Sequence, residues 1–324
     1  MKAIVSYLSR NQFVAALFLL ALGLFLIQIK TILIVFFLSY ILMAAIHPSV
    51  AFLERKKWPR ILAVSVIYLM IIAVVLLIIL PILPFFVSQI QNLFINFPIY
   101  FEKAAQTLGF NIAYSNFDLS SYFENLSSNI ILITSTLFGG IFSFFTIIVI
   151  SFYLVLYHDR FERSIIHMFP KEGREKVQVV FSDIENSLGK WVRGQLVLSF
   201  SVGLISWIFL QLLGVPYAFP LAFITGLLEI IPMIGPILGA IPAVIVALTI
   251  SPTLALAVTA GYVVIQTIEN NVLVPKIMQS AVGLNPVITI IAILVGGTLL
   301  GIWGALIAVP FFAMLMIILT ALND

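Results

Sequence analysis

The chain has 324 residues, of which 62% are hydrophobic and only 9% are charged. An average soluble domain is about one quarter charged, so this composition excludes a water-soluble globular domain. The formal net charge of +3 is small, and the basic residues fall between the apolar stretches, so nucleic acid is not an expected partner. The absence of cysteine excludes disulfides, thiolate metal ligands and a cysteine nucleophile.

Apolar stretches able to cross a hydrocarbon core of about 30 Å recur along the chain. They predict an all-α, polytopic integral membrane protein with about eight to ten membrane segments, for which the lipid bilayer is the main solvent. Residues 1–84 are expected to form three N-terminal membrane helices, at about 11–29, 31–50 and 61–84. The first two are interpreted as a hairpin of retained helices, because the first lacks the small-residue cleavage site of a signal peptide.

A polar, aromatic-rich segment, residues 85–129, separates the third predicted span from the fourth, residues 130–157. Ile90, Phe94 and Phe97 recur at helical spacing, which predicts an extracytoplasmic amphipathic helix. Such a helix can lie on the membrane surface, against a neighbouring subunit or on its own helix bundle. The sequence leaves these alternatives open.

Residues 158–193 carry most of the charge, with both signs interspersed, and they predict solvated cytoplasmic helices. Cytoplasmic loops retain an excess of lysine and arginine during insertion. An N-terminus inside the cell leaves only Lys30 and Lys103 outside among the basic residues. We therefore expect a multi-pass protein of the cell (inner) membrane with both termini in the cytoplasm.

Residues 194–320 are predicted to form a C-terminal transport core. Two apolar blocks, 216–250 and 284–320, are too long for one simple span, and each is interrupted by glycine or proline. We interpret them as helical hairpins, either re-entrant or fully spanning. Their shared order of features suggests an inverted repeat, although glycine and proline are also simply frequent in membrane helices. The breaks are predicted at Pro232, Gly235, Pro236, Pro242, Pro275 and Pro286.

Glu229 and Glu269 are the acidic residues inside the apolar blocks of the C-terminal half. A charged side chain at the centre of a membrane helix costs at least about 2.5 kcal/mol, so function is the default hypothesis. Pro232 and Pro236 follow Glu229, and each is expected to free the carbonyl four residues before it. A carboxylate beside free carbonyls suits a cation, a proton or a polar substrate group. The alternative is a structural carboxylate bonded to the bent backbone.

Glu269 lies in a polar run with Gln266, Asn270 and Asn271, ahead of Pro275. Gln266 is three residues before Glu269 and can share its helical face, whereas Asn270 points elsewhere. With Glu229, these four residues are the candidate transport or ion-coupling residues. The alternative for Glu269 is an interfacial carboxylate within reach of water, because it lies near the cytoplasmic end of its span.

Enzyme signatures are absent from the sequence. The histidines, His47, His158 and His167, lack the local spacing of metal ligands. The glycines near Gly296 are not accompanied by the lysine and serine or threonine of a phosphate-binding loop. We therefore expect no catalytic residue, no metal and no cofactor, and transport energy from an ion gradient or from the gradient of the substrate itself.

Several runs of residues match one known family in order and spacing. These runs are Lys190-Trp191-Val192-Arg193-Gly194-Gln195, Leu213-Gly214-Val215-Pro216, Ile231-Pro232-Met233-Ile234-Gly235-Pro236, Glu269-Asn270-Asn271-Val272-Leu273-Val274-Pro275-Lys276, Gly283-Leu284-Asn285-Pro286 and Gly301-Ile302-Trp303-Gly304. In these runs the chain resembles the autoinducer-2 exporter family of bacterial and archaeal membrane proteins.

The resemblance implies an inner-membrane transporter that assembles as a homo-oligomer. Members of the family have been linked to export of the autoinducer-2 signal, and some to sodium–proton antiport. Met233 stands where the family often has tyrosine, and Asn285 stands where it often has histidine. If either position contacts the substrate or titrates, the resemblance does not define the specificity of this member.

The leading prediction is a secondary transporter that exports a small polar solute, such as an autoinducer-2-like signal, coupled to an ion or proton gradient. Within transport, the alternative is a sodium–proton antiporter. The alternative from another class is a non-transporting, oligomeric membrane scaffold. A polar cavity that reaches Glu229 would favour a transporter, whereas a scaffold would bury Glu229 away from water.

Overall fold

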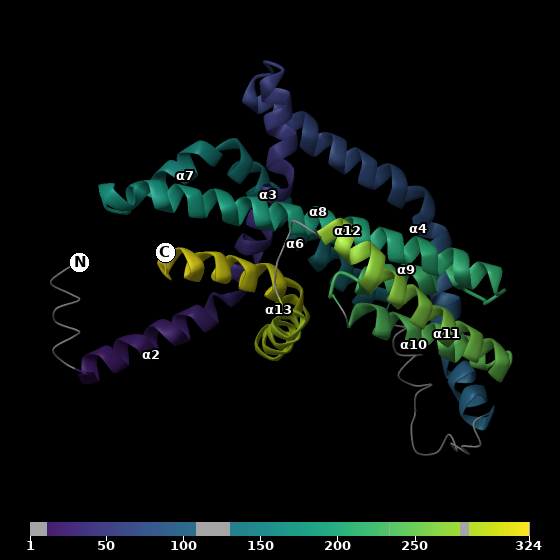
Figure 1. The fold of residues 1–324 in the computed structure, drawn as a ribbon. Coiled ribbons are helices and arrows are strands. Elements are labelled where there is room, and N and C mark those ends of the chain that lie inside the picture. Colours follow the sequence, from purple (N-terminus) through teal and green to yellow (C-terminus); the bar gives the residue numbers. More distant parts are fainter. Residues whose placement is uncertain (1–11, 108–129, 233, 279–284, 324) are drawn as a thin grey trace.

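The computed structural model describes residues 12–107, 130–232, 234–278 and 285–323, and every regular element within them is a helix (Figure 1). The predicted all-α class is therefore confirmed. The helices of the first half are α2 (Gln12–Gln28), α3 (Lys30–Arg55), α4 (Arg60–Thr107), α6 (Ile130–Leu156), α7 (His158–His167) and the 3-10 helix η1 (Lys171–Gly173).

The second half begins with the longest of its helices. Its elements are α8 (Arg174–Leu212), α9 (Ala218–Leu228), α10 (Gly235–Leu248), α11 (Pro252–Ile268), the π-helix η2 (Glu269–Leu273), α12 (Val274–Met278) and α13 (Pro286–Asn323). Within the described residues, five helices are long and apolar enough to cross a membrane, and the bent pair of α6 and α7 makes a sixth candidate. A multi-pass helical protein is thus confirmed, while the predicted count of eight to ten segments is not.

The helices α2 and α3 meet at a bend. The amide of Ile29 donates to the carbonyl of Phe25 at 3.0 Å, and the amide of Leu33 donates to the carbonyl of Ile29 at 3.1 Å, so helical bonding continues through the junction. In Figure 1, α2 extends away from α3 and does not fold back along it. The predicted hairpin of 11–29 and 31–50 is therefore not formed, because a single residue between two apolar stretches leaves the backbone bonds intact.

The helix α4 is continuous over 48 residues. It joins the predicted span 61–84 to the start of the predicted amphipathic segment 85–129, because the prolines of this stretch do not end the helix. At about 1.5 Å per residue, α4 is roughly 72 Å long and must extend beyond a bilayer core. The side chains of Ile90, Phe94 and Phe97 and residues 108–129 lie outside the described part of the chain, so the surface on which this segment packs stays open.

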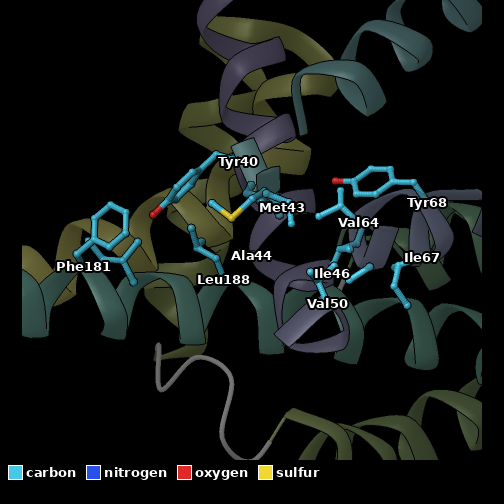
Figure 2. Close-up of a cluster of buried hydrophobic side chains, with 14 residues drawn as sticks. Tyr40, Met43, Ala44, Ile46, Val50, Val64, Ile67, Tyr68, Phe181 and Leu188 are labelled. Carbon is cyan, nitrogen blue, oxygen red and sulfur yellow. The ribbon is translucent and has the colours of Figure 1, made fainter. Parts of the chain in front are cut away.

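A buried cluster joins α3, α4, α6 and α8 (Figure 2). Met43 of α3 and Val64 of α4 are fully buried in it, and Leu188 brings in α8. The hydroxyl groups of Tyr68 and Ser151 form a buried hydrogen bond that links α4 to α6. A buried hydroxyl without a partner would be unfavourable, so this pair satisfies the polar groups of an otherwise apolar contact.

The helix α8 packs against helices of both halves of the chain (Figure 1). Its first half packs against α3, α7 and α13, and its second half packs against α9, α11 and α12. Because 39 residues of helix span roughly 58 Å, α8 connects the charged segment with the C-terminal apolar blocks.

The helix α13 contains a sharp reversal at Gly301. This glycine has φ 64° and ψ −147°, which is a conformation that other residues rarely adopt. A straight helix would separate Gly296 from Gly304 by about 12 Å along its axis, yet a Cβ atom at either glycine would overlap the carbonyl of the other. The chain therefore turns back, as expected for the block 284–320, with arms 286–300 and 302–323.

Candidate functional site

The first C-terminal hairpin is formed by α9 and α10, which have 11 and 14 residues. At about 1.5 Å per residue each is shorter than a bilayer core. The helix α9 packs closely on α8, since a Cβ atom at Gly226 would lie 2.9 Å from the Ser199 carbonyl oxygen and 3.0 Å from the Cα atom of Gly203. Glycine pairs of this kind allow two helix backbones to approach in a membrane.

The joint between α9 and α10 contains Glu229 and the prolines Pro232 and Pro236. Proline cannot supply the amide that a helix needs, which explains why α9 ends at Leu228 and why the next helix starts with Gly235 and Pro236. The expectation of free carbonyls here is wrong. The Leu228 carbonyl accepts from the amide of Ile231, and the Pro232 carbonyl accepts from the amide of Ile234, each at 2.9 Å. A tight turn has replaced the missing helical bonds.

Glu229 is completely buried, with 0% of its surface exposed. Its backbone carbonyl accepts a hydrogen bond from the side-chain amide of Gln195 on α8. Both carboxyl oxygens of Glu229 lack a hydrogen-bond donor. The joint is thus anchored through the backbone of Glu229, while its side chain stays available for another partner.

Glu269 is the first residue of the π-helix η2 and is 2% exposed. The amide of Val274 donates to its carbonyl five residues back, which is the π-helical pattern. Pro275 cannot continue α-helical bonding to Asn271, which favours the wider turn. Such short π-helical segments occur often at functional sites.

The structure brings the carboxyl groups of Glu229 and Glu269 close enough to interact electrostatically, and Gln266 lies beside Glu269. Asn270 and Asn271 do not join this pair. Both are exposed, and the side-chain amide of Asn271 donates to the carbonyl of Thr267 at 2.8 Å. Of the five predicted coupling residues, the two glutamates therefore form a buried pair, and the half-buried Gln266 lies next to Glu269.

Two carboxyl groups in contact can form a hydrogen bond only if one of them carries a proton, because an ionised carboxylate is purely an acceptor. If both are ionised, they repel each other unless a cation lies between them. The chemistry open to this pair is therefore the exchange of a proton or the binding of a cation.

The predicted break residues lie in different settings. Pro232 is in the joint, Gly235 and Pro236 begin α10, and Pro242 is inside α10 without ending it. Pro275 follows the π-helix, and Pro286 begins α13. Asn285 precedes it, and its side-chain oxygen accepts from the amide of Val287 at 2.9 Å, so this departure from the family pattern caps a helix. Met233 lies outside the described residues.

Sequence reasoning missed a row of polar side chains on the inner face of α8. Gln195, Ser199 and Ser206 have the spacing of one helical face, and each has a buried oxygen without a partner. On the neighbouring helices, the hydroxyl groups of Thr225 and Tyr262 are 3.0 Å apart and buried. The spacing along α8 was the signal available in the sequence.

An apolar groove of about 310 Å³ runs between α8 and α9 beside this row. Its lining includes Ser199, Gly226 and Ile230 but neither glutamate. In this conformation both glutamates are buried, and the polar cavity expected at Glu229 is not seen in that groove. Contact between the pair and water therefore requires a change of conformation.

A multi-pass helical bundle with a buried acidic pair beside broken helices is the architecture of a membrane transporter. The AI-2E transporter family matches residues 14–324, so the chain belongs to that family and the predicted resemblance is confirmed.

Individual relatives agree with this assignment. Two Bacillus subtilis (strain 168) proteins named for transport are similar along most of their length. YueF is 31% identical over 89% of this chain and 84% of its own length. YrrI is 29% identical over 91% of this chain and 88% of its own length. The AI-2 transport protein TqsA of Escherichia coli (strain K12) is 27% identical over 86% of this chain and 83% of its own.

Proposed function

We propose that this protein is a secondary transporter in which Glu229 and Glu269 couple the movement of a small polar solute to a proton or ion gradient. The observation that carries the proposal is the proximity of two buried carboxyl groups, of which both oxygens of Glu229 and one oxygen of Glu269 lack a hydrogen-bond partner. Burying a charged group without a partner is strongly unfavourable. In the buried conformation, one shared proton therefore stabilises the pair. A second state, in which the pair binds a cation or both groups are hydrated, requires a change in the hairpin.

The proposed substrate is a small polar solute such as an autoinducer-2-like signal, and the proposed direction is export. The name of TqsA as an AI-2 transport protein supports this choice. The row of Gln195, Ser199 and Ser206 supplies unpaired polar atoms on the face of α8 nearest the hairpin. Hydroxyl and amide groups of this kind suit a ligand that carries several hydroxyl groups.

In the proposed arrangement, residues 194–320 form the transport core and α9 and α10 form a re-entrant hairpin in the inner membrane. The segment 158–193 and both chain termini lie in the cytoplasm. Arg60 of α4 contacts Asp159 of α7, so the basic loop before α4 and the charged segment share one end of the bundle, which supports this orientation. We also propose that several copies of the chain assemble into a homo-oligomer.

A sodium–proton antiporter is the second candidate. The observation that favours it is the acceptor-only character of the pair, since oxygen atoms are the ligands that hard cations prefer. In this case no organic substrate would be needed. The scaffold alternative is favoured only by the complete burial of Glu229, which an occluded transporter would share.

Flux into proteoliposomes separates these functions. Purified protein is reconstituted, and uptake is measured under a proton gradient alone and a sodium gradient alone, with autoinducer-2 and without an organic solute. We expect autoinducer-2 flux that depends on one gradient. Exchange of protons for sodium without an organic solute would assign antiport, and no flux under any condition would favour a scaffold.

The variant Glu229→Gln tests the role of the pair, because it preserves shape and cannot titrate. We expect gradient-driven flux to fall to the level of empty vesicles while the protein still inserts and purifies. Glu172→Gln is the matched control, since Glu172 is exposed in the 3-10 helix η1 within the charged segment. Normal, gradient-dependent transport by Glu229→Gln would make Glu229 a structural residue.

A further inference from the structure

A second, partly buried polar cluster lies against the first half of α8, whereas Glu229 is anchored by Gln195 in the second half. It consists of His47 near the end of α3, His158 at the bend between α6 and α7, and Glu185 on α8. Each residue offers one ligand atom, and these three atoms lie within 4.8 Å of one another. The sequence argument against a metal site considered local spacing only, whereas the fold brings these residues together from three separate helices.

The contacts within the cluster are short. The Nε2 atom of His158 is 2.8 Å from a carboxyl oxygen of Glu185. The rings of His47 and His158 are stacked, with their centroids 4.1 Å apart. His158 is only 6% exposed, and the side chain of Glu185 is 13% exposed.

The surroundings orient the three side chains. The hydroxyl of Tyr40 donates to Glu185 at 3.4 Å. The Nδ1 atom of His158 faces a carboxyl oxygen of Asp159 at 3.4 Å, and Asp159 in turn pairs with Arg60. A histidine that binds a metal through one nitrogen usually presents its other nitrogen to a carboxylate or carbonyl, as His158 does.

We propose that His47, His158 and Glu185 form a binding site for a divalent transition-metal ion of the zinc type. Two imidazoles and one carboxylate make up a donor set that zinc uses when it has three protein ligands and one open position. Zinc bonds of about 2.0–2.1 Å hold the ligand atoms roughly 3.4 Å apart in a tetrahedron. The three ligand atoms must therefore shift by at most about 1.4 Å, and the two stacked imidazole rings must also turn so that one nitrogen of each points at the same ion. Rotation about χ2 of the histidines, a torsion with broad minima, supplies this turn.

The bound ion would tie α3, the bend between α6 and α7, and α8 to one another. The bend of 74° between α6 and α7 lies at this point. The ion would therefore fix the direction in which the charged segment leaves the membrane region. This role is independent of the proton or ion coupling proposed for Glu229 and Glu269.

The test uses the full chain, purified in detergent with an affinity tag that lacks histidine and stripped with a chelator. Zinc is then added, and the metal retained after gel filtration is measured together with the dissociation constant from a competition titration. We expect about one zinc ion per chain. Cobalt substitution should give visible absorption bands typical of four-coordinate nitrogen and oxygen ligands.

Variants locate the site. His47→Gln and His158→Gln should each weaken zinc binding by more than tenfold, because each removes a direct ligand. His167→Gln is the matched control, since His167 is exposed at the other end of α7, and it should bind as the wild type does. Asp159→Asn, which keeps the shape of the side chain, should weaken binding by about tenfold or more.

Two results would overturn the proposal. One is a wild-type protein that retains no zinc and gives no cobalt bands. The other is zinc binding that is unchanged in His47→Gln and His158→Gln. If those two variants fail to elute as folded protein, the wild-type cobalt spectrum and the Asp159→Asn affinity decide the question.

Discussion

Substituting Gly235 with alanine tests whether the joint between α9 and α10 holds the acidic pair in place. A Cβ atom at Gly235 would lie 2.7 Å from the amide nitrogen of Glu229 and would overlap the carbonyl group of Leu228. Ordinary contacts between heavy atoms are about 3.5–4.0 Å. The joint must therefore open by at least about 0.8 Å, and the atoms in conflict belong to the backbone, which cannot rotate away.

The expected effect is large in both stability and transport. Overpacking of a close contact typically costs about 1–3 kcal/mol, and the backbone overlap places Gly235→Ala at the upper end. The apparent melting temperature in detergent should fall by several degrees. A displacement near 1 Å of a functional group can lower a rate by about two orders of magnitude, so flux should fall by a similar factor.

The assay pairs thermal unfolding in detergent with flux into proteoliposomes. Gly297→Ala is the control, because the nearest atom to an added Cβ atom is that of Ala305 at 3.9 Å. This control should match the wild type or be slightly more stable, since alanine is the better helix former. Wild-type stability and flux in Gly235→Ala would refute the view that this close approach positions Glu229.

Three further predictions concern other contacts. Tyr262→Phe removes the hydrogen bond to Thr225 and should lower the free energy of unfolding by about 1 kcal/mol, as measured by thermal unfolding. The loss is small because Thr225 keeps its bond to the Leu221 carbonyl, and an unchanged stability would mean that the two hydroxyl groups do not bond. Gln195→Leu leaves the Glu229 carbonyl unpaired, so it should lower the free energy of unfolding by about 1–3 kcal/mol and slow flux. Normal flux would show that the contact between α8 and Glu229 is not needed for transport. Single-cysteine variants Lys57→Cys and Lys176→Cys, possible because the chain has no cysteine of its own, should react with an impermeant thiol reagent only from the cytoplasmic side, and reaction of either from outside would contradict the proposed orientation.

Composition and hydropathy were sufficient to predict the helical membrane class, because lipid requires every backbone group to be bonded within its own segment. The position of the break before α10 could also be predicted, since Pro232 and Pro236 cannot continue a helix. Whether the freed carbonyls stay unpaired could not be predicted from the sequence. Whether a carbonyl is left unpaired depends on the turn that replaces the helix, and here Ile231 and Ile234 supply the missing amides.

The two glutamates were selected singly from the sequence, and their contact emerged only from the fold. Glu229 and Glu269 belong to different helical elements, so no local spacing relates them. The same holds for His47, His158 and Glu185. Local patterns describe one helix face at a time, whereas a site made from several helices depends on crossings such as that of Gly203 and Gly226, where glycines permit close approach.

The length of α8 has a mechanical consequence. Glu185 and Gln195 are on the same uninterrupted helix, and at 1.5 Å per residue they are roughly 15 Å apart along its axis. A helix without a proline or an internal break bends little over that distance. A tilt or slide imposed on α8 at the histidine cluster would thus reach the backbone anchor of Glu229 almost undiminished. The helix would transmit movement between the histidine cluster and the joint that holds Glu229.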